Sequence, residues 1–373
     1  MKLLQSLLKG LLLFTLLSII SVPSFAQIED VGPILQSGKE DANTLVKSYL
    51  KPFGSGFGAG LNTGWTNTAK THNTLGFDLT VSSGLAIVPD TDLSFDVNDL
   101  NLQQLEVKST SSVAPTINGP EQPGATLAAY EDVDGNGVEE ELFSFDMPQG
   151  TGFEYVPAPM IKAGVGLIKN TDVMVRFVPE YDIPEVGGSF KLFGVGVKHD
   201  VKQWLPGGNL IPVDISVMYG YTTMDLNSEL ELLPEDVIQD QNNTENPYAA
   251  STWQGQNAAL TSDAWTINAL VGKTLPVISV YGGVGYEAST LSIKTAGSYP
   301  TVVPNTAYQD DPNNNEPMTV EAVDEPIDVE IDGKNGFRAL AGFRLRFAIF
   351  HISGSYTLAN YSSYNLGVGI SFR

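Results

Sequence analysis

The feature that most constrains this chain is a period of two in its apolar residues. From Gly54 to the C-terminus, about 11 segments carry aliphatic or aromatic side chains at every second position, with glycine, polar or charged residues between them. Successive side chains of a strand point to opposite faces, so each segment predicts a strand with one apolar face. The stretch with Phe57, Ala59 and Leu61 is expected to be the first strand. The last strand would carry on one face Tyr364, Leu366, Val368, Ile370 and Phe372.

The predicted fold is all-β: a transmembrane antiparallel β-barrel of about 12–14 strands with a short N-terminal helix. A soluble sandwich also alternates, but it would not keep glycine and charge on one face throughout. Single-chain bacterial barrels have even strand numbers, so the segments counted leave at least one strand unassigned. Residues 54–373 are therefore assigned to a single barrel.

Residues 1–26 are predicted to be a secretory signal peptide. Lys2 and Lys9 precede an apolar run over residues 11–20, and Ser24-Phe25-Ala26 forms a small-x-small cleavage site. The alternative, an uncleaved anchor, is disfavoured because the run is shorter than the ~20 residues of a spanning helix. The chain has no cysteine, which excludes disulfides and lipoprotein processing. The expected location is the cell outer membrane.

Residues 27–53 are expected to hold one short helix. Ser37 and Glu40 have the spacing of a capping box, and Pro52 would end the run. The helix could be a tether against the periplasmic end of the barrel or a plug in the lumen. The tether is the favoured alternative.

Three long connections separate the predicted strands, at residues 89–159, 227–262 and 295–335, whereas the others are short. With a periplasmic C-terminus, all three fall outside the cell, where barrels carry their long loops. They hold 29 of the 43 acidic residues and only two basic ones, Lys108 and Lys334. This charge serves to solvate the loops or, alternatively, to attract cations at the surface. It argues against nucleic acid as a partner.

Charged residues recur at positions opposite the apolar face, so they are predicted to line the lumen. They are Asp78, Lys162, Arg176, Asp214, Glu287, Arg338 and Arg344. Either they fill a closed interior as ion pairs, or they line a solute pathway. The leading functional prediction is passive or plug-gated passage of a small solute through the lumen. The alternative is a closed structural or surface-interaction barrel that acts through its acidic extracellular loops.

The first long loop contains a calcium candidate. Asp132, Asp134 and Asn136 supply oxygen ligands at alternate positions beside a glycine. The position of the EF-hand glutamate is Phe143, so the segment is no EF-hand, and a solvated hairpin turn explains the same residues. No other cofactor is expected.

Catalysis is not expected. The chain has no G-x-S-x-G motif, and its three histidines, His72, His199 and His351, fall at predicted periplasmic strand ends. A barrel phospholipase or protease would need its base near the outer leaflet. The protein is therefore predicted not to be an enzyme.

Two resemblances to outer-membrane proteins add to the barrel prediction. The C-terminal strand resembles the assembly signal of Gram-negative outer-membrane barrels, although the aromatic Phe372 is penultimate and Arg373 is last. It implies contact with the barrel-assembly machinery and with outer-membrane lipid. The motifs at residues 57–65, 67–72, 157–160, 194–200 and 203–206 resemble an uncharacterised outer-membrane barrel family of Bacteroidota, a domain of unknown function. That likeness implies a barrel and no activity; an architecture like that of FadL-type fatty-acid transporters is an analogy.

Overall fold

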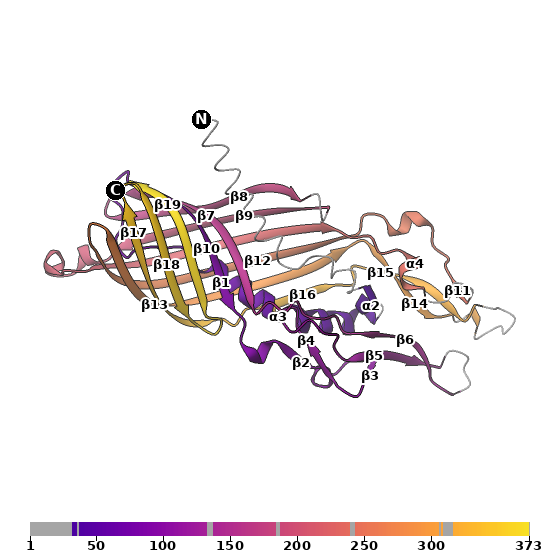
Figure 1. Ribbon diagram of the computed structural model, residues 1–373. Coiled ribbons are helices and arrows are strands. Elements are labelled where there is room, and N and C mark those ends of the chain that lie inside the picture. The colour runs from indigo at the N-terminus through magenta and orange to yellow at the C-terminus, as the bar shows by residue number, and fades with distance from the viewer. Residues whose placement is uncertain are drawn as a thin grey trace.

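The computed structural model describes residues 32–35, 37–132, 137–183, 187–238, 243–305, 307–308 and 316–372. Within these ranges the largest sheet is antiparallel and closes on itself, since β19 pairs with β1 and β12 with β13 (Figure 1). The ring consists of β1 (Phe77–Ile87), β7 (Tyr155–Leu167), β8 (Thr171–Ile183), β9 (Gly188–Asp200), β10 (Asp214–Glu229), β12 (Asn257–Thr274), β13 (Ile278–Ala296), β17 (Gly336–Phe347), β18 (Phe350–Leu358) and β19 (Ser363–Phe372). The predicted antiparallel barrel is confirmed.

The predicted strand number is wrong: the described ring has ten strands, not about 12–14. β16 (Asp328–Asp332) only extends one side of the ring by pairing with the end of β13. The stretch expected as the first strand, with Phe57, Ala59 and Leu61, belongs to helix α3 (Gly38–Leu61). The helix is thus longer than predicted and runs through Pro52 and past the predicted boundary at residue 54. The even strand number needs no missing strand.

The outward face of the ring is apolar between two aromatic levels. At one end an aromatic belt crosses six neighbouring strands of the ring, from β10 to β19, with four ring contacts along it. It comprises Tyr219, Trp265, Tyr286, Phe337, Tyr356 and Tyr364. At the other end Phe77 stacks on Phe372, with ring centroids 6.4 Å apart. Apolar bands flanked by aromatic girdles mark where a barrel crosses a membrane. Among the described helices, none has the length and hydrophobicity to cross a membrane.

The connections divide the molecule into a loop end and a turn end. The loop end has the three long connections, at residues 88–154, 230–256 and 297–335, and two short ones, at 184–187 and 359–362. The turn end has short connections at 168–170, 275–277 and 348–349 and a longer one at 201–213. Phe77 and Phe372, the first residue of β1 and the last residue of β19, both lie at the turn end. Outer-membrane barrels place long loops outside the cell, so the loop end corresponds to the end predicted to be extracellular, and that orientation remains a prediction.

The long connections fold into an outer layer, seen to the right in Figure 1. It contains three small sheets, β2–β4, β3–β5–β6 and β11–β15–β14. Its strands are β2 (Ser94–Asp96), β3 (Leu105–Val107), β4 (Val113–Pro115), β5 (Thr126–Glu131), β6 (Glu140–Asp146), β11 (Thr244–Glu245), β14 (Ser298–Pro304) and β15 (Met318–Asp324). Its helices are α2 (Gly32–Leu35), α4 (Pro234–Val237), η2 (Asp90–Asp92), η3 (Val97–Leu100) and η7 (Ala250–Trp253); η5 (Lys202–Trp204) and η6 (Gly208–Leu210) lie at the turn end.

An apolar core joins this outer layer to the start of α3. Leu45 of α3 packs in one cluster with Leu127 of the first loop and Ile331 of β16. The buried Asp41 carboxylate accepts hydrogen bonds of 2.7, 2.8 and 3.1 Å from three successive amides, those of residues 103–105. The loops are therefore a folded layer built on the N-terminal helix.

Candidate functional site: the filled lumen

Helix α3 enters the barrel from the loop end. Its first turns lie in the core of the outer layer, and its last turns contact β1, β7, β12, β13 and β19 of the ring. The chain then runs on through the lumen and leaves at the turn end, where Phe77 begins β1. The helix is therefore a plug that belongs to the lumen, and the alternative of a tether at the periplasmic end is wrong.

Alternating glycines let the helix fit. A Cβ at Gly56 or Gly60 would lie 2.7 Å from the side chain of Val156 or Ala158 in β7. A Cβ at Gly58 would lie 2.0 Å from the Ser289 hydroxyl in β13. Two residues turn an α-helix by about 200°, so glycines spaced two apart line two opposite sides. The period of two that predicted a strand here thus serves close packing of a helix between two walls.

Two arginines from the wall cap the C-terminal end of α3. Arg176 of β8 donates to the carbonyls of Leu61 and Thr63. Arg338 of β17 donates to the Asn62 carbonyl over 3.0 Å. The last carbonyls of a helix lack partners within it and carry partial negative charge, so guanidinium groups both satisfy and neutralise them.

Trp65 fixes the chain directly below the helix. Its indole is buried, and the Arg176 guanidinium carbon lies 3.8 Å from the ring centroid. The ring sits against Gly196 and Gly220, where a Cβ would approach it to 2.6 and 2.4 Å. The Arg176 side chain therefore clamps both the helix end and the indole.

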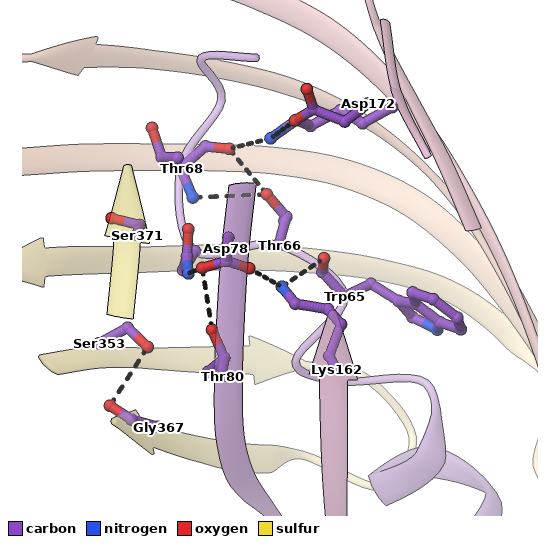
Figure 2. Close-up of polar contacts among 12 residues, drawn as sticks. Trp65, Thr66, Thr68, Asp78, Thr80, Lys162, Asp172, Ser353, Gly367 and Ser371 are labelled. Carbon is purple, nitrogen blue, oxygen red and sulfur yellow. Dashed lines mark hydrogen bonds and ion pairs between the residues drawn. The ribbon is translucent and has the colours of Figure 1, made fainter. Parts of the chain in front are cut away.

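Below Trp65, wall side chains hold one backbone carbonyl after another. Figure 2 shows Lys162 reaching the Trp65 carbonyl at 3.0 Å and Asp78 at 3.6 Å. The remaining donations are Tyr281 to Thr66, Lys198 to Thr68 and to Lys70, and Ser216 to Ala69, at 2.8–3.3 Å. The segment from residue 61 to 70 is thus bonded to the wall mainly through its main chain.

Two buried charge clusters anchor the turn end of this segment. Asp172 accepts from the His72 amide at 2.8 Å and lies 3.0 Å from His72 Nδ1 and 3.1 Å from Lys198 Nζ. In the second cluster, Asp78 lies 3.6 Å from His351, and Arg344 donates to the Asn67 side chain at 3.2 Å. Among the described residues, these groups and the plug occupy the lumen, and a cavity of about 20 Å³ beside Trp65 has room for roughly one water molecule.

Six of the seven residues predicted to line the lumen are buried there: Asp78, Lys162, Arg176, Glu287, Arg338 and Arg344. Glu287 pairs with Arg338 at 2.7 Å. Asp214 differs, because it lies half-buried at the turn end, where it is 3.9 Å from Lys202 and accepts a hydrogen bond from Thr274 at 3.0 Å. The structure therefore brings six predicted residues together, though as partners of the plug.

Sequence analysis missed several residues of this site: Trp65, His72, Asp172, Lys198 and His351. His351 and Lys198 lie on the polar faces of their strands, one position beyond the segments in which alternation was counted. Extending the alternation by one residue would have placed both in the lumen. Trp65 carries no such signal, because it lies outside any strand.

The calcium prediction remains a prediction. Asp132 is described, and its carboxylate accepts a hydrogen bond from the Gly137 amide at 2.7 Å. Asp134 and Asn136 lie outside the described residues, as does the signal peptide over residues 1–26. Within the described ranges, no group of three acidic or histidine side chains has the arrangement of a metal site.

Asp92, Tyr361 and Lys334 form a polar cluster, called the clasp, that links the outer layer to the barrel rim. Asp92 of η2 accepts from the Tyr361 hydroxyl at 2.5 Å and lies 2.8 Å from Lys334. Burial alone would raise the pKa of Asp92, but the hydrogen bonds from Lys334 and Tyr361 outweigh it and lower the pKa below 3.8. A depressed carboxyl pKa stabilises the folded state above the unfolded pKa, and that stabilisation is lost as the pH falls through the folded value.

In the unchanged protein, we expect the contacts of Asp92 with Tyr361 and Lys334 to weaken below about pH 4. In Asp92→Asn, we expect them to be weak already at pH 7. Hydrogen exchange of residues 88–100 would measure this weakening, with exchange faster by roughly five- to tenfold for a loss of about 1 kcal/mol. Asp90→Asn, which changes an acidic neighbour in the same 3-10 helix, is the control. Equal protection in both variants at pH 7 would show that the clasp contributes nothing.

A closed antiparallel ring, an apolar outer band and a filled lumen define an outer-membrane β-barrel protein. The chain belongs to the family described as "Family of unknown function (DUF6588)", which it matches over residues 1–372. No curated protein matches it. The Bacteroidota source and the FadL-like architecture remain predictions.

Several solved outer-membrane proteins match most of this chain, each at low identity and with a low TM-score. The attachment invasion locus protein Ail of Yersinia pestis, solved with a heparin analogue, is 7% identical, with 80% of this chain and 100% of that chain covered and a TM-score of 0.25. The translocator domain of the autotransporter NalP from Neisseria meningitidis is 9% identical, with 81% and 90% covered and a TM-score of 0.26. The outer membrane transporter YddB from Escherichia coli is 9% identical, with 79% and 43% covered and a TM-score of 0.26.

Proposed function

We propose that this protein is a closed outer-membrane barrel that acts through the folded layer it holds outside the membrane. The filled lumen carries the proposal. An open channel needs a continuous water path, whereas here α3 and the chain below it occupy the interior and are bonded to the wall from Leu61 to His72. The same helix is the core of the outer layer, so plugging and display depend on one element.

The outer layer offers an acidic surface, because the connections at residues 88–154, 230–256 and 297–335 hold 28 acidic residues and two basic ones. Such a surface attracts cations and positively charged partners and repels anionic ones. We propose a surface-interaction role that is not catalytic. The C-terminal strand, which closes the ring against β1, is the part that we propose the assembly machinery recognises.

Plug-gated passage of a small solute is the second candidate. One observation favours it: the ring closes through strand pairing alone, so the wall does not depend on the plug for its ladder. Passage would require α3 and the segment below it to leave the lumen. That movement would break the buried hydrogen bonds described above.

The test is single-channel recording of the refolded, intact protein in a planar bilayer. A closed barrel predicts no stepwise current at moderate voltage. A folded preparation is identified by its heat-dependent mobility on a gel, so that silence is not mistaken for failure to insert. Stable, long-lived openings of the unmodified protein would contradict the proposal and favour solute passage.

A further inference from the structure

In the described part of the barrel wall, the neighbouring strands β7 and β8 are hydrogen-bonded over only part of their length. We call the unbonded part the seam. These strands pair only from Lys162 with Arg176 to Leu167 with Thr171. Both continue toward the loop end, β7 up to Tyr155 and β8 up to Ile183, and there each is bonded to its other neighbour. Figure 1 shows the two strands diverging.

The sequence of β7 prevents the missing ladder from forming. The Gly166 amide donates to Gly76, and its carbonyl accepts from Leu75, so even-numbered residues of β7 turn their peptide groups toward β1. Odd-numbered residues then face β8. Pro157 and Pro159 are both odd, and proline has no N–H to donate. The β7 edge therefore lacks two donors where β8 would need them.

The β8 edge has the same defect. The Asn170 carbonyl accepts a hydrogen bond from β9, so up to Val178 the even-numbered residues of β8 face β9 and the odd ones face β7. Pro179 follows directly, in a bulge that shifts the pairing of β8 with β9 between Val178 and Tyr181. Extending the register beyond Lys162 and Arg176 would place Pro179 opposite Pro159. Neither can donate, so this edge of the wall is held by side-chain packing, with Pro159 buried and Pro179 exposed.

The seam opens at the outer-leaflet edge of the membrane. Pro157 pairs across β1 with Leu85, which in turn pairs with Tyr364 of the aromatic belt. Phe177, the first residue of β8 above the last rung, is 57% exposed on the lipid side. Lipid chains therefore lie directly beside the unbonded strands.

The interior behind the seam is apolar. Val156, Ala158 and Met160 of β7 and Val178 of β8 are buried in one cluster with Phe57 of α3. The polar part of the lumen begins at the last rung, where Lys162 and Arg176 point inward. A molecule that entered through the seam would contact apolar side chains at the level of the seam. The charged side chains of Lys162 and Arg176 would lie below it.

We propose that the β7–β8 seam is a lateral entry site for the acyl chain of an outer-leaflet lipid, which inserts between the unbonded strands by parting the side chains that pack there around Phe57. A free fatty acid from solution would first have to cross the acidic outer layer with its own negative charge. The bilayer is therefore the source of the chain. The proposal goes beyond the proposed surface role and does not depend on it.

Photo-crosslinking tests the site. The intact protein is reconstituted in vesicles that contain a phospholipid with a diazirine in its acyl chain, irradiated, and mapped by mass spectrometry. Labelling is expected on the lipid-facing Val175 and Phe177 and also on the inward-facing Met160, Val178 or Phe57. Labelling of outward residues alone would overturn the proposal. Inward labelling by free diazirine fatty acid, without inward labelling by the phospholipid, would overturn the bilayer as source.

A covalent crosslink between β7 and β8 supplies the matched control. The chain has no cysteine, so a pair of introduced thiols is unambiguous. A thiol crosslink in Pro159→Cys/Pro179→Cys should abolish inward labelling and leave outward labelling unchanged. The same crosslink in Ala163→Cys/Val175→Cys, a pair already in the ladder, should preserve inward labelling. Equal inward labelling in both crosslinked proteins would also overturn the proposal.

Discussion

Deletion of residues 38–72 is expected to turn a silent barrel into a channel with steady, stepwise conductance. These residues form α3 and the luminal chain below it, and the ladder of the ring does not include them. Removing them leaves Arg176, Arg338, Arg344, Lys162 and Lys198 in the lumen against Asp78, Asp172 and Glu287. The exposed lumen is therefore positive, and the current should be anion-selective.

Two comparisons make this result specific. Arg344→Met in the deleted protein should reduce the anion preference without closing the channel. Gly60→Leu in the full chain is the milder variant: its side chain would collide with Ala158, so it should give brief openings as the helix fails to seat. Gly137→Leu, at a loop glycine with nothing within 4 Å of an added Cβ, is a control with no expected current despite backbone strain from its positive φ.

A deleted protein that folds yet stays silent would contradict this account of the plug. It would mean that the wall side chains collapse into the space. A ten-stranded ring is narrow enough for that outcome to be physically reasonable, since barrels of about eight strands are filled by their own side chains.

The barrel could be predicted from the sequence because lipid imposes the same alternation on every strand. Phe77, Val195 and Leu366 face outward by the same rule, and one register error would turn a whole apolar face inward. The helix could not be predicted in this way. Around Phe57 the period of two arises from glycines that pack against opposite walls, and a strand produces the same spacing.

The sequence predicted which charged residues lie in the lumen, but it did not predict which groups they bind there. Arg176 and Lys162 could be placed inside from their neighbours, yet their main partners are the carbonyls of Leu61, Thr63 and Trp65. Main-chain carbonyls carry no residue-specific signal. For the same reason the sequence led to passage of a solute as the leading prediction, with a closed interior as the alternative, and it carried no sign of the path that the chain takes after α3.

Arg176→Met is expected to be the most damaging single substitution in the lumen. Arg176 is completely buried, and it donates to Leu61, Thr63 and Thr222. Its loss leaves two buried carbonyls without this hydrogen-bond donor, and each unsatisfied carbonyl costs about 1–3 kcal/mol. It also removes the cation–π contact with Trp65. Relief of the burial cost of the guanidinium offsets part of this. A net destabilisation of about 2–4 kcal/mol follows.

Urea-driven unfolding in lipid vesicles, followed by tryptophan fluorescence, measures this loss. Arg346→Met is the matched control, because Arg346 lies at the turn end, donates to the Pro276 carbonyl at 3.1 Å and is partly exposed; its effect should stay within about 0.5 kcal/mol. Arg176→Lys should be intermediate, since one ammonium cannot reproduce the fork that holds two carbonyls and covers a ring. If Arg176→Met unfolded at the same urea concentration as the unchanged protein, the helix end would have to be held by Arg338 alone, and the wall would contribute packing rather than capping to the plug.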